Sequence, residues 1–215
     1  MRHERLGIFG ASGMAKEVSD IGALLGFEPF FIVPDQHMET AENQAGPRRR
    51  VVPESGVFSV DCGHFVIGIG DSELRSNLFK KLGHRLPFTS LIHPAATCEI
   101  SSAQIREAST SVIVGASAVI TSAVSVGVGC IFNIGSSVSH DCNIGDFVTV
   151  SPKASILGNV NVGDGCLIGA NAVILQGSKY QPRFICPGAV IGAGAVVTKD
   201  VVSPGTYVGM PARKI

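Results

Sequence analysis

The chain has 215 residues, of which 17 are Lys or Arg and 17 are Asp or Glu, so its formal net charge is zero. This balance excludes a strongly basic protein, and we expect neither nucleic acid nor a membrane surface as a partner. With 45% hydrophobic and 16% charged residues, the chain has the composition of a folded protein of one large or two small domains. It shows no signal-peptide pattern and no apolar run of about 18 residues, and its six cysteines lack the spacing of disulfides or metal ligands. We therefore expect a cytoplasmic protein that binds no metal.

The first ninety residues predict a small α/β unit with a parallel sheet. Residues 6–9 form the first expected strand, and a glycine turn and a helix follow it. One face of that helix carries Val18, Ile21, Leu24 and Leu25. A second strand covers residues 30–33, and a third ends at residue 69. The helix after the third strand should be capped by Ser72, and its apolar side chains are Leu74, Leu78 and Leu82.

The first glycine turn predicts a phosphate site. Gly7, Gly10 and Gly13 have the spacing G-x-x-G-x-x-G, which differs from the dinucleotide pattern G-x-G-x-x-G. A glycine turn before a helix N-terminus can still cradle a phosphate, and Asp35 closes the second strand, where such folds place a ribose-binding carboxylate. The alternative is that these glycines only make tight turns. A half-Rossmann-like unit of this length favours a mononucleotide moiety over NAD.

From Val114 onward every sixth residue is aliphatic or Phe over eleven consecutive positions. These positions are Val114, Ile120, Val126, Phe132, Val138, Ile144, Val150, Ile156, Val162, Ile168 and Ile174. The residues four places later are small or Val, namely Ala118, Val124, Cys130, Ser136, Cys142, Val148, Ala154, Val160, Cys166, Ala172 and Ser178. Such a period fits neither a lone helix nor a lone strand and predicts a parallel β-helix with three hexapeptides per coil. Its three cysteines then fill small core positions.

The hexapeptide phase breaks after Ser178, where we expect an external loop, and resumes at Ile185, Ile191 and Val197. Before Val114 the pattern is looser. We therefore expect an α+β protein of two domains, with residues 1–91 forming the α/β unit and residues 92–215 forming the β-helix.

A His–Asp pair interrupts the repeat at a place that otherwise has little charge. Between Val114 and Gly163 the only histidine is His140, and Asp141 follows it. Two residues after an inward position, His140 should face outward, with Ser122 and Gly158 stacked about 4.8 Å away on the neighbouring coils. An imidazole can accept a proton at neutral pH, so the pair is a candidate general base. The alternatives are a turn histidine without function and an aspartate that only caps a turn.

These stretches together resemble the hexapeptide-repeat acyltransferase superfamily. The motif N-x-G-x-x-x-x-H-[DE]-C-x-I-G-[DE] spans residues 133–146, and "GIFGASGMAKEV", "VIGIGDSELR", "IGAGAVVTKDV" and "GMPARKI" extend the likeness along the chain. The closer resemblance is to nucleotide-aminosugar N-acetyltransferases, which are related to sialic-acid O-acetyltransferases. This resemblance implies a left-handed β-helix, acetyl-CoA as co-substrate, a homotrimer, and active sites between adjacent β-helices.

The resemblance also implies roles for individual residues. His140 matches the catalytic histidine with Asp141 beside it, and Asn133 matches the motif asparagine at the substrate. Gly10, Ser12, Gly13 and Asp35 match the nucleotide-sugar region, and Gly158, Ala193 and Lys199 match the path of CoA. The chain departs from the family at Met14 and Thr149, where histidines are common.

The implied reaction is N-acetylation of a nucleotide-linked amino sugar, first of all a 4-amino-4,6-dideoxy sugar, in polysaccharide or glycan biosynthesis. O-acetylation of a sugar such as sialic acid is the alternative. A zinc hydratase of the carbonic-anhydrase type would need three converging histidines, whereas the strict repeat has one. A non-catalytic scaffold is the last candidate.

Outward residues also predict association into a trimer, for which we take Val119, Val124, Ile131 and Ser137 as examples.

Overall fold

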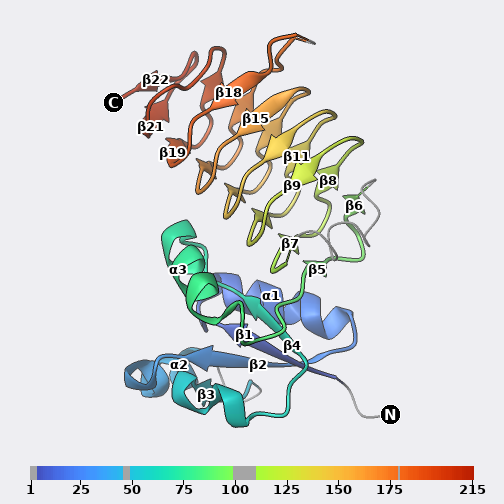
Figure 1. Cartoon of the computed structure of the whole chain (residues 1–215), viewed down its shortest axis with the longest axis vertical. Coiled ribbons are helices and arrows are strands. Elements are labelled where there is room, and N and C mark those ends of the chain that lie inside the picture. The colour runs from blue at the N-terminus through green and yellow to red at the C-terminus, as the bar shows by residue number, and fades with distance from the viewer. Residues whose placement is uncertain (1–3, 46–48, 99–109, 179) are drawn as a thin grey trace.

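The computed structural model describes residues 4–45, 49–98, 110–178 and 180–215. An N-terminal α/β unit packs against one end of a parallel β-helix, and the chain ends at the far end of that β-helix (Figure 1). No helix in these ranges is both long and apolar enough to cross a membrane.

The α/β unit is built on a four-stranded parallel sheet in the order β3-β2-β1-β4. Its strands are β1 (Arg5–Phe9), β2 (Glu28–Val33), β3 (Val51–Pro53) and β4 (His64–Ile67). Its helices are α1 (Gly13–Leu24), α2 (Met38–Ala45) and α3 (Ser72–Leu82), with short 3-10 turns at Asp35–His37 and Glu54–Ser59. The three expected strands are confirmed, whereas β3 was missed because three residues are too few to show a period.

Two expectations about the helices were wrong. Asp71, not Ser72, caps α3, because its Oδ1 accepts a hydrogen bond from the backbone N–H of Leu74 at 2.8 Å. Leu24 and Leu74 are exposed, at 62% and 58%, since the buried stripe of each helix faces another way. In α1 that stripe passes through Val18 and Ile21.

The β-helix consists of three sheets, which are parallel except for the last strand, and from β7 to β20 successive strands of the chain enter successive sheets. The sheet that we call the β10 sheet contains β5 (Leu91–Ile92), β7 (Ile113–Val114), β10 (Ile131–Phe132), β13 (Thr149–Val150), β16 (Leu167–Ile168), β19 (Ala189–Ile191), β21 (Gly205–Val208) and the antiparallel β22 (Arg213–Lys214). The β11 sheet contains β6 (Thr97–Cys98), β8 (Val119–Ile120), β11 (Ser137–Val138), β14 (Ser155–Ile156), β17 (Val173–Ile174) and β20 (Val196–Val197). The β12 sheet contains β9 (Ser125–Val126), β12 (Asn143–Ile144), β15 (Val160–Val162) and β18 (Arg183–Ile185).

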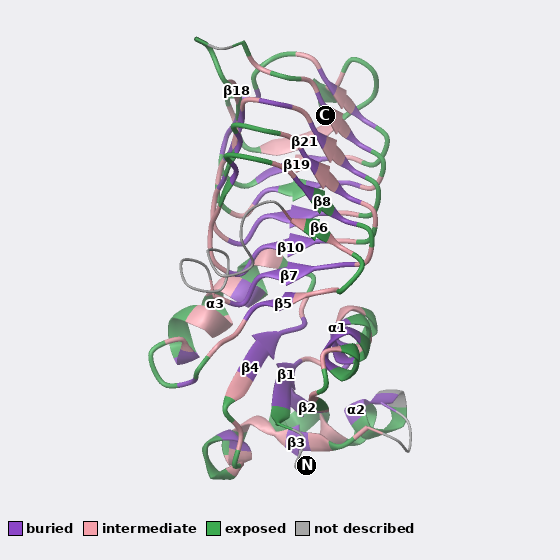
Figure 2. Cartoon of the chain, turned by 90° about the vertical axis from the view of Figure 1, so that its right-hand side faces the viewer, coloured by how far each residue is buried: buried purple, intermediate pink, exposed green. Residues whose placement is uncertain are grey.

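The hexapeptide count describes the core of the β-helix. All eleven large positions belong to it, with Val126 only partly buried, and the chain returns to the core at Ile185, Ile191 and Val197 as expected. Buried segments therefore recur from coil to coil along the β-helix (Figure 2). Ser178 is the exception among the small positions, because the chain leaves the coil there and pairs with Gln181.

The corners of the coils repeat with the same period. Every sixth residue from Ser111 to Asn171 has a positive φ. The full set is Ser111, Ser117, Ala123, Gly129, Gly135, Asp141, Phe147, Lys153, Asn159, Gly165 and Asn171. Asp141 is thus a turn residue, with a φ of 60°, and Asp tolerates this conformation better than most residues do.

Two of the four outward examples are in fact buried. Val124 lies in the core of the β-helix at 6% exposure, because it occupies a small inward position of the repeat. Ile131 points outward from its coil but is covered by the α/β unit, in one cluster with Leu6 and Ile8. Only Val119 and Ser137 are left as outward, partly accessible residues.

Candidate functional site

One longitudinal edge of the β-helix, which we call the His140 edge, begins where the strands of the β11 sheet end. Its residues each lie two places after such a strand and are Ser122, His140, Gly158, Gln176 and Lys199. The parallel register stacks them on successive coils, as the 18-residue step predicts.

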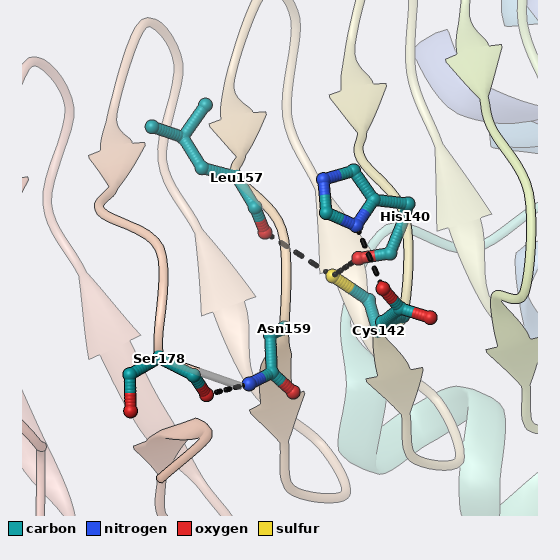
Figure 3. A network of polar contacts seen from close by, with 6 residues as sticks. His140, Cys142, Leu157, Asn159 and Ser178 are labelled. Carbon is teal, nitrogen blue, oxygen red and sulfur yellow. Dashed lines mark hydrogen bonds and ion pairs between the residues drawn. The ribbon is translucent and has the colours of Figure 1, made fainter. Parts of the chain in front are cut away.

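His140 forms a close pair with the residue that follows it. The imidazole Nδ1 of His140 lies 2.8 Å from Oδ2 of Asp141, and both side chains are mostly exposed (Figure 3). With the proton on Nδ1, the ring donates to the carboxylate, and Nε2 keeps a free lone pair. The exposed imidazole is therefore a candidate proton acceptor.

Gly158 supports the imidazole from the next coil. A Cβ added at Gly158 would lie 2.7 Å from Cε1 and 2.8 Å from Nε2 of His140. The missing side chain therefore makes room for the ring itself. That CoA also passes at Gly158, as the sequence resemblance implies, stays a prediction.

The imidazole borders an open groove with a volume of about 810 Å³. The groove is lined by Ser139, His140, Asp141, Leu157, Gly158, Asn159, Gln176 and Gly177. Asn159 donates from Nδ2 to the backbone oxygen of Ser178 (Figure 3). Sequence reasoning missed Gln176 and Asn159. The 18-residue period could have found both, because Gln176 lies two coils after His140 and Asn159 lies one coil after Asp141.

Cys142 is the thiol closest in sequence to His140, and it is unsuited to nucleophilic chemistry. It is fully buried, and its Sγ–H donates to the backbone oxygen of Leu157 at 3.2 Å. Burial raises the pKa of this thiol, so at neutral pH it stays protonated. Cys130 and Cys166 are equally buried in the core.

The residues expected to bind the nucleotide sugar gather at the carboxyl ends of β1 and β2. Gly10 has a φ of 108° and donates its N–H to the backbone oxygen of Ile32 at 2.9 Å. Ser12 precedes α1 without a side-chain capping bond, and Gly13 faces open space. Asp35 accepts from the backbone N–H of Ser55 at 3.1 Å, and the hydrogen bonding of Ser55 lowers the pKa of this carboxyl.

Asn133 lies away from His140. It sits on the turn that enters the β11 sheet, whereas His140 sits on the turn that leaves it. Its Oδ1 accepts from the backbone N–H of Ile134 at 2.8 Å, and the residue borders a smaller groove of about 200 Å³ beside α1, together with Met14. Within one chain the two motif residues therefore occupy opposite edges of one sheet.

The remaining candidates divide in the same way. Lys199 lies on the His140 edge, whereas Ala193 follows β19 of the β10 sheet and lies on another edge. Thr149 is buried, and its Oγ1 accepts a hydrogen bond from Arg75 at 2.8 Å. Sequence reasoning did not identify Arg75.

Within residues 4–45, 49–98, 110–178 and 180–215, no group of three or more His, Cys, Asp or Glu side chains is arranged to hold a metal ion.

Two family models match the chain. The model described as "Bacterial transferase hexapeptide (six repeats)" matches residues 141–176, and the model described as "PglD N-terminal domain" matches residues 5–82. The chain is also 44% identical over 83 residues to the GDP-perosamine N-acetyltransferase of Escherichia coli O157:H7. That match spans 39% of this chain and only 38% of the length of that relative.

Solved structures match over almost the whole chain, and two of them serve as examples. The structure of WeeI from Acinetobacter baumannii AYE is 30% identical, with a TM-score of 0.86, and the match covers 99% of this chain and 100% of WeeI. The acetyltransferase domain of PglB from Neisseria gonorrhoeae FA1090, solved in complex with acetyl coenzyme A, is 25% identical, with a TM-score of 0.83 and full coverage of both chains.

Proposed function

Because the chain belongs to the hexapeptide-repeat acyltransferase family, we propose that it transfers the acetyl group of acetyl-CoA to the amino group of a nucleotide-linked amino sugar. The observation that carries the proposal is the His140–Asp141 pair, whose imidazole borders an open groove. The match to an enzyme named GDP-perosamine N-acetyltransferase and the likeness to a domain solved with acetyl coenzyme A support it.

In this reaction His140 acts as the general base. The sugar nitrogen attacks the acetyl carbonyl carbon, the carbon–sulfur bond breaks, and Nε2 takes the proton that the nitrogen loses. The imidazolium then returns a proton to the departing thiolate, so that free CoA thiol is the second product. Asp141 holds the ring in the tautomer that leaves Nε2 free. A direct transfer of this kind needs no cysteine nucleophile and no metal.

Acetyl-CoA would lie along the outside of the β-helix, with Gly158 and Lys199 on the His140 edge and Ala193 on a neighbouring edge. The nucleotide would bind at Gly10, Ser12, Gly13 and Asp35, which face the carboxyl edge of the sheet, where α/β folds bind such ligands. Lys199 would supply a local positive charge for a phosphate of CoA.

We propose a homotrimer of left-handed β-helices, each preceded by a nucleotide-binding domain of residues 1–91. Asn133 and His140 occupy opposite edges of the β11 sheet, so a site that uses both needs two chains. A three-fold arrangement around the outer face of this sheet, which carries Val119 and Ser137, would bring the His140 edge of one chain to the Asn133 edge of the next. A reducing, cytoplasmic setting belongs to the same proposal, because all six cysteines are free.

The test compares acceptors with acetyl-CoA as donor and the release of CoA thiol as readout. Nucleotide-linked 4-amino-4,6-dideoxy sugars should be acetylated, with the added acetyl group located on nitrogen by mass spectrometry, while free sialic acid should not react. Turnover of sialic acid alone would make the protein an O-acetyltransferase. Turnover that is equal in His140→Ala would overturn the proposed chemistry.

The trimer is tested separately by light scattering. The chain has a mass of 22.3 kDa, so the proposal requires about three times that mass at all working concentrations. A monomer that is stable on dilution would contradict the shared site.

A further inference from the structure

Arg75 of α3 is fully buried at the junction between the α/β unit and the β-helix. Its guanidinium donates five hydrogen bonds of 2.7 to 2.9 Å. The acceptors are the backbone oxygens of Ile69, Gly70, Gly129 and Phe147 and the Oγ1 of Thr149. Two of these acceptors belong to the turn after β4, and three belong to the β-helix.

None of these five acceptors is a carboxylate. Burial lowers the pKa of Arg75 to about 10, while the nearby charge of Asp71 acts in the opposite direction, so the side chain stays charged at neutral pH. Among the described residues, no carboxylate accepts a hydrogen bond from it. A buried cation of this kind stabilises a fold poorly compared with an apolar residue. The guanidinium instead fixes the relative positions of its acceptors, because its planar group donates hydrogen bonds in several set directions at once.

The rest of the same helix face also contacts the β-helix. Ser72 and Phe79 lie three residues before and four after Arg75, so they share one side of α3. Ser72 donates from Oγ to the backbone oxygen of Gly165 at 3.3 Å. The ring of Phe79 meets the ring of Phe147 edge-on, with the centroids 5.8 Å apart.

The β-helix residues at this junction form one column of corner positions. Gly129, Phe147 and Gly165 follow each other at intervals of one coil, and each has a positive φ. Phe147, with a φ of 56°, is a bulky residue in a conformation that costs about 1 kcal/mol or more. Its ring occupies the space beside Gly129, where an added Cβ would lie 2.4 Å away. The strained aromatic therefore lies where α3 docks.

The junction also reaches the glycine turn expected to bind phosphate. The carbonyls of Ile69 and Gly70, which Arg75 holds, belong to the turn that runs beside Gly10. A Cβ at Gly10 would lie 3.0 Å from the backbone oxygen of Gly68 and 3.3 Å from the side chain of Ile69. A series of contacts therefore runs from the corner column through Arg75 to the turn at Gly10.

We propose that Arg75 is a positioning residue for the acetyl transfer, which fixes the nucleotide-binding turn relative to the β-helix. This inference rests on the proposed function. An acceptor anchored by its nucleotide can place its amine at the acetyl group only if the two parts keep a fixed relation, since small displacements of reacting groups lower rates steeply. An acceptor without a nucleotide does not use this anchor.

The test therefore compares two acceptors in Arg75→Lys, which keeps the charge but loses the fork, and in Arg75→Met, which loses both. We expect kcat/KM for the nucleotide-linked amino sugar to fall at least about tenfold, mainly in kcat. Transfer to the free 4-amino-4,6-dideoxy sugar, which we expect to be slow, and the KM for acetyl-CoA should stay within twofold of wild type. Arg5→Met, which removes a surface arginine of the same unit, is the matched control and should change neither acceptor. An equal loss for both acceptors, or no loss for either, overturns the proposal.

A second measurement does not depend on turnover. In Arg75→Lys, hydrogen exchange should accelerate in residues 69–75, 129–131 and 147–149, while the distant strands β14 and β17 keep their protection. Uniform acceleration, or none at the junction, would show that Arg75 does not fix it. If wild type acetylates no nucleotide-linked amino sugar but this local acceleration occurs, the proposed function fails while the junction is still as described. Ser72→Ala loses one hydrogen bond of the same helix face. It should show a smaller loss of kcat/KM for the nucleotide-linked acceptor and a smaller local acceleration of hydrogen exchange. This variant tests the proposal if the Arg75 variants do not fold.

Discussion

The imidazole Nδ1 of His140 lies 2.8 Å from the carboxylate Oδ2 of Asp141, although the two residues are adjacent in the chain. Neighbouring side chains on a strand point to opposite faces, and this contact exists because Asp141 adopts the left-handed corner conformation, with a φ of 60°. One residue therefore makes the turn of the coil and orients the base.

Replacing His140 by Ala should lower kcat at least about 10²-fold, the usual loss when general-base assistance is removed. The affinity for acetyl-CoA and the melting temperature should hardly change, because the side chain is 64% exposed and contributes little to the core. Higher pH should partly restore the rate, since solvent then deprotonates the sugar ammonium. The pH–rate profiles of wild type and variant, recorded side by side, measure this. An unchanged kcat with the same acidic limb would remove His140 from the mechanism.

Asp141→Asn should cost less activity than His140→Ala. Asn tolerates the left-handed conformation as well as Asp does, so this substitution removes the charge beside the ring and leaves the turn intact. Asp141→Ala should lose about as much activity as Asp141→Asn. In addition, backbone strain should lower its free energy of unfolding by about 1 kcal/mol. Asn171→Ala is the matched control, because Asn171 has a φ of 57° at an equivalent corner away from His140. If Asp141→Asn loses as much stability as Asp141→Ala, strain is not the cause.

Gly158→Ala should reduce kcat nearly as much as His140→Ala. The new methyl group would lie within 3 Å of the imidazole and must displace the ring from its place beside Asp141. Because the ring is exposed and free to swing into solvent, the melting temperature should change little. Gly63→Ala is the control, since a Cβ there meets nothing within 4 Å. In the double variant with His140→Ala, the Gly158 substitution should cost nothing further, and additive losses would contradict the steric explanation.

Most of the β-helix was predictable because a repeated coil imposes the same demand on every sixth residue. A large side chain must fill the interior at Val138 and again at Ile156, and stacking by one coil then places Gly158 against His140. Contacts between the two parts of the molecule carry no such period. Nothing in the local sequence separates the buried Arg75 from a solvated helix residue, or the covered Ile131 from its exposed neighbours, because both depend on where α3 and the parallel sheet dock.

Alkaline pH should destabilise the protein through its buried thiols. Burial raises the pKa of Cys130 to about 12 and that of Cys166 to about 11, from 9.0 for an exposed thiol. Below pH 9 both thiols are protonated in the folded and the unfolded chain, so the stability linked to them is fully present. Between pH 9 and pH 12 only the unfolded chain ionises its thiol at Cys130, and the unfolding free energy falls by up to about 1.4 kcal/mol per pH unit for that group. Urea unfolding across this range should show a shallower decline in Cys130→Ala than in wild type. Identical slopes would mean that the thiol is accessible in the folded protein, and alkylation of Cys130 at pH 9 without denaturant would confirm that outcome.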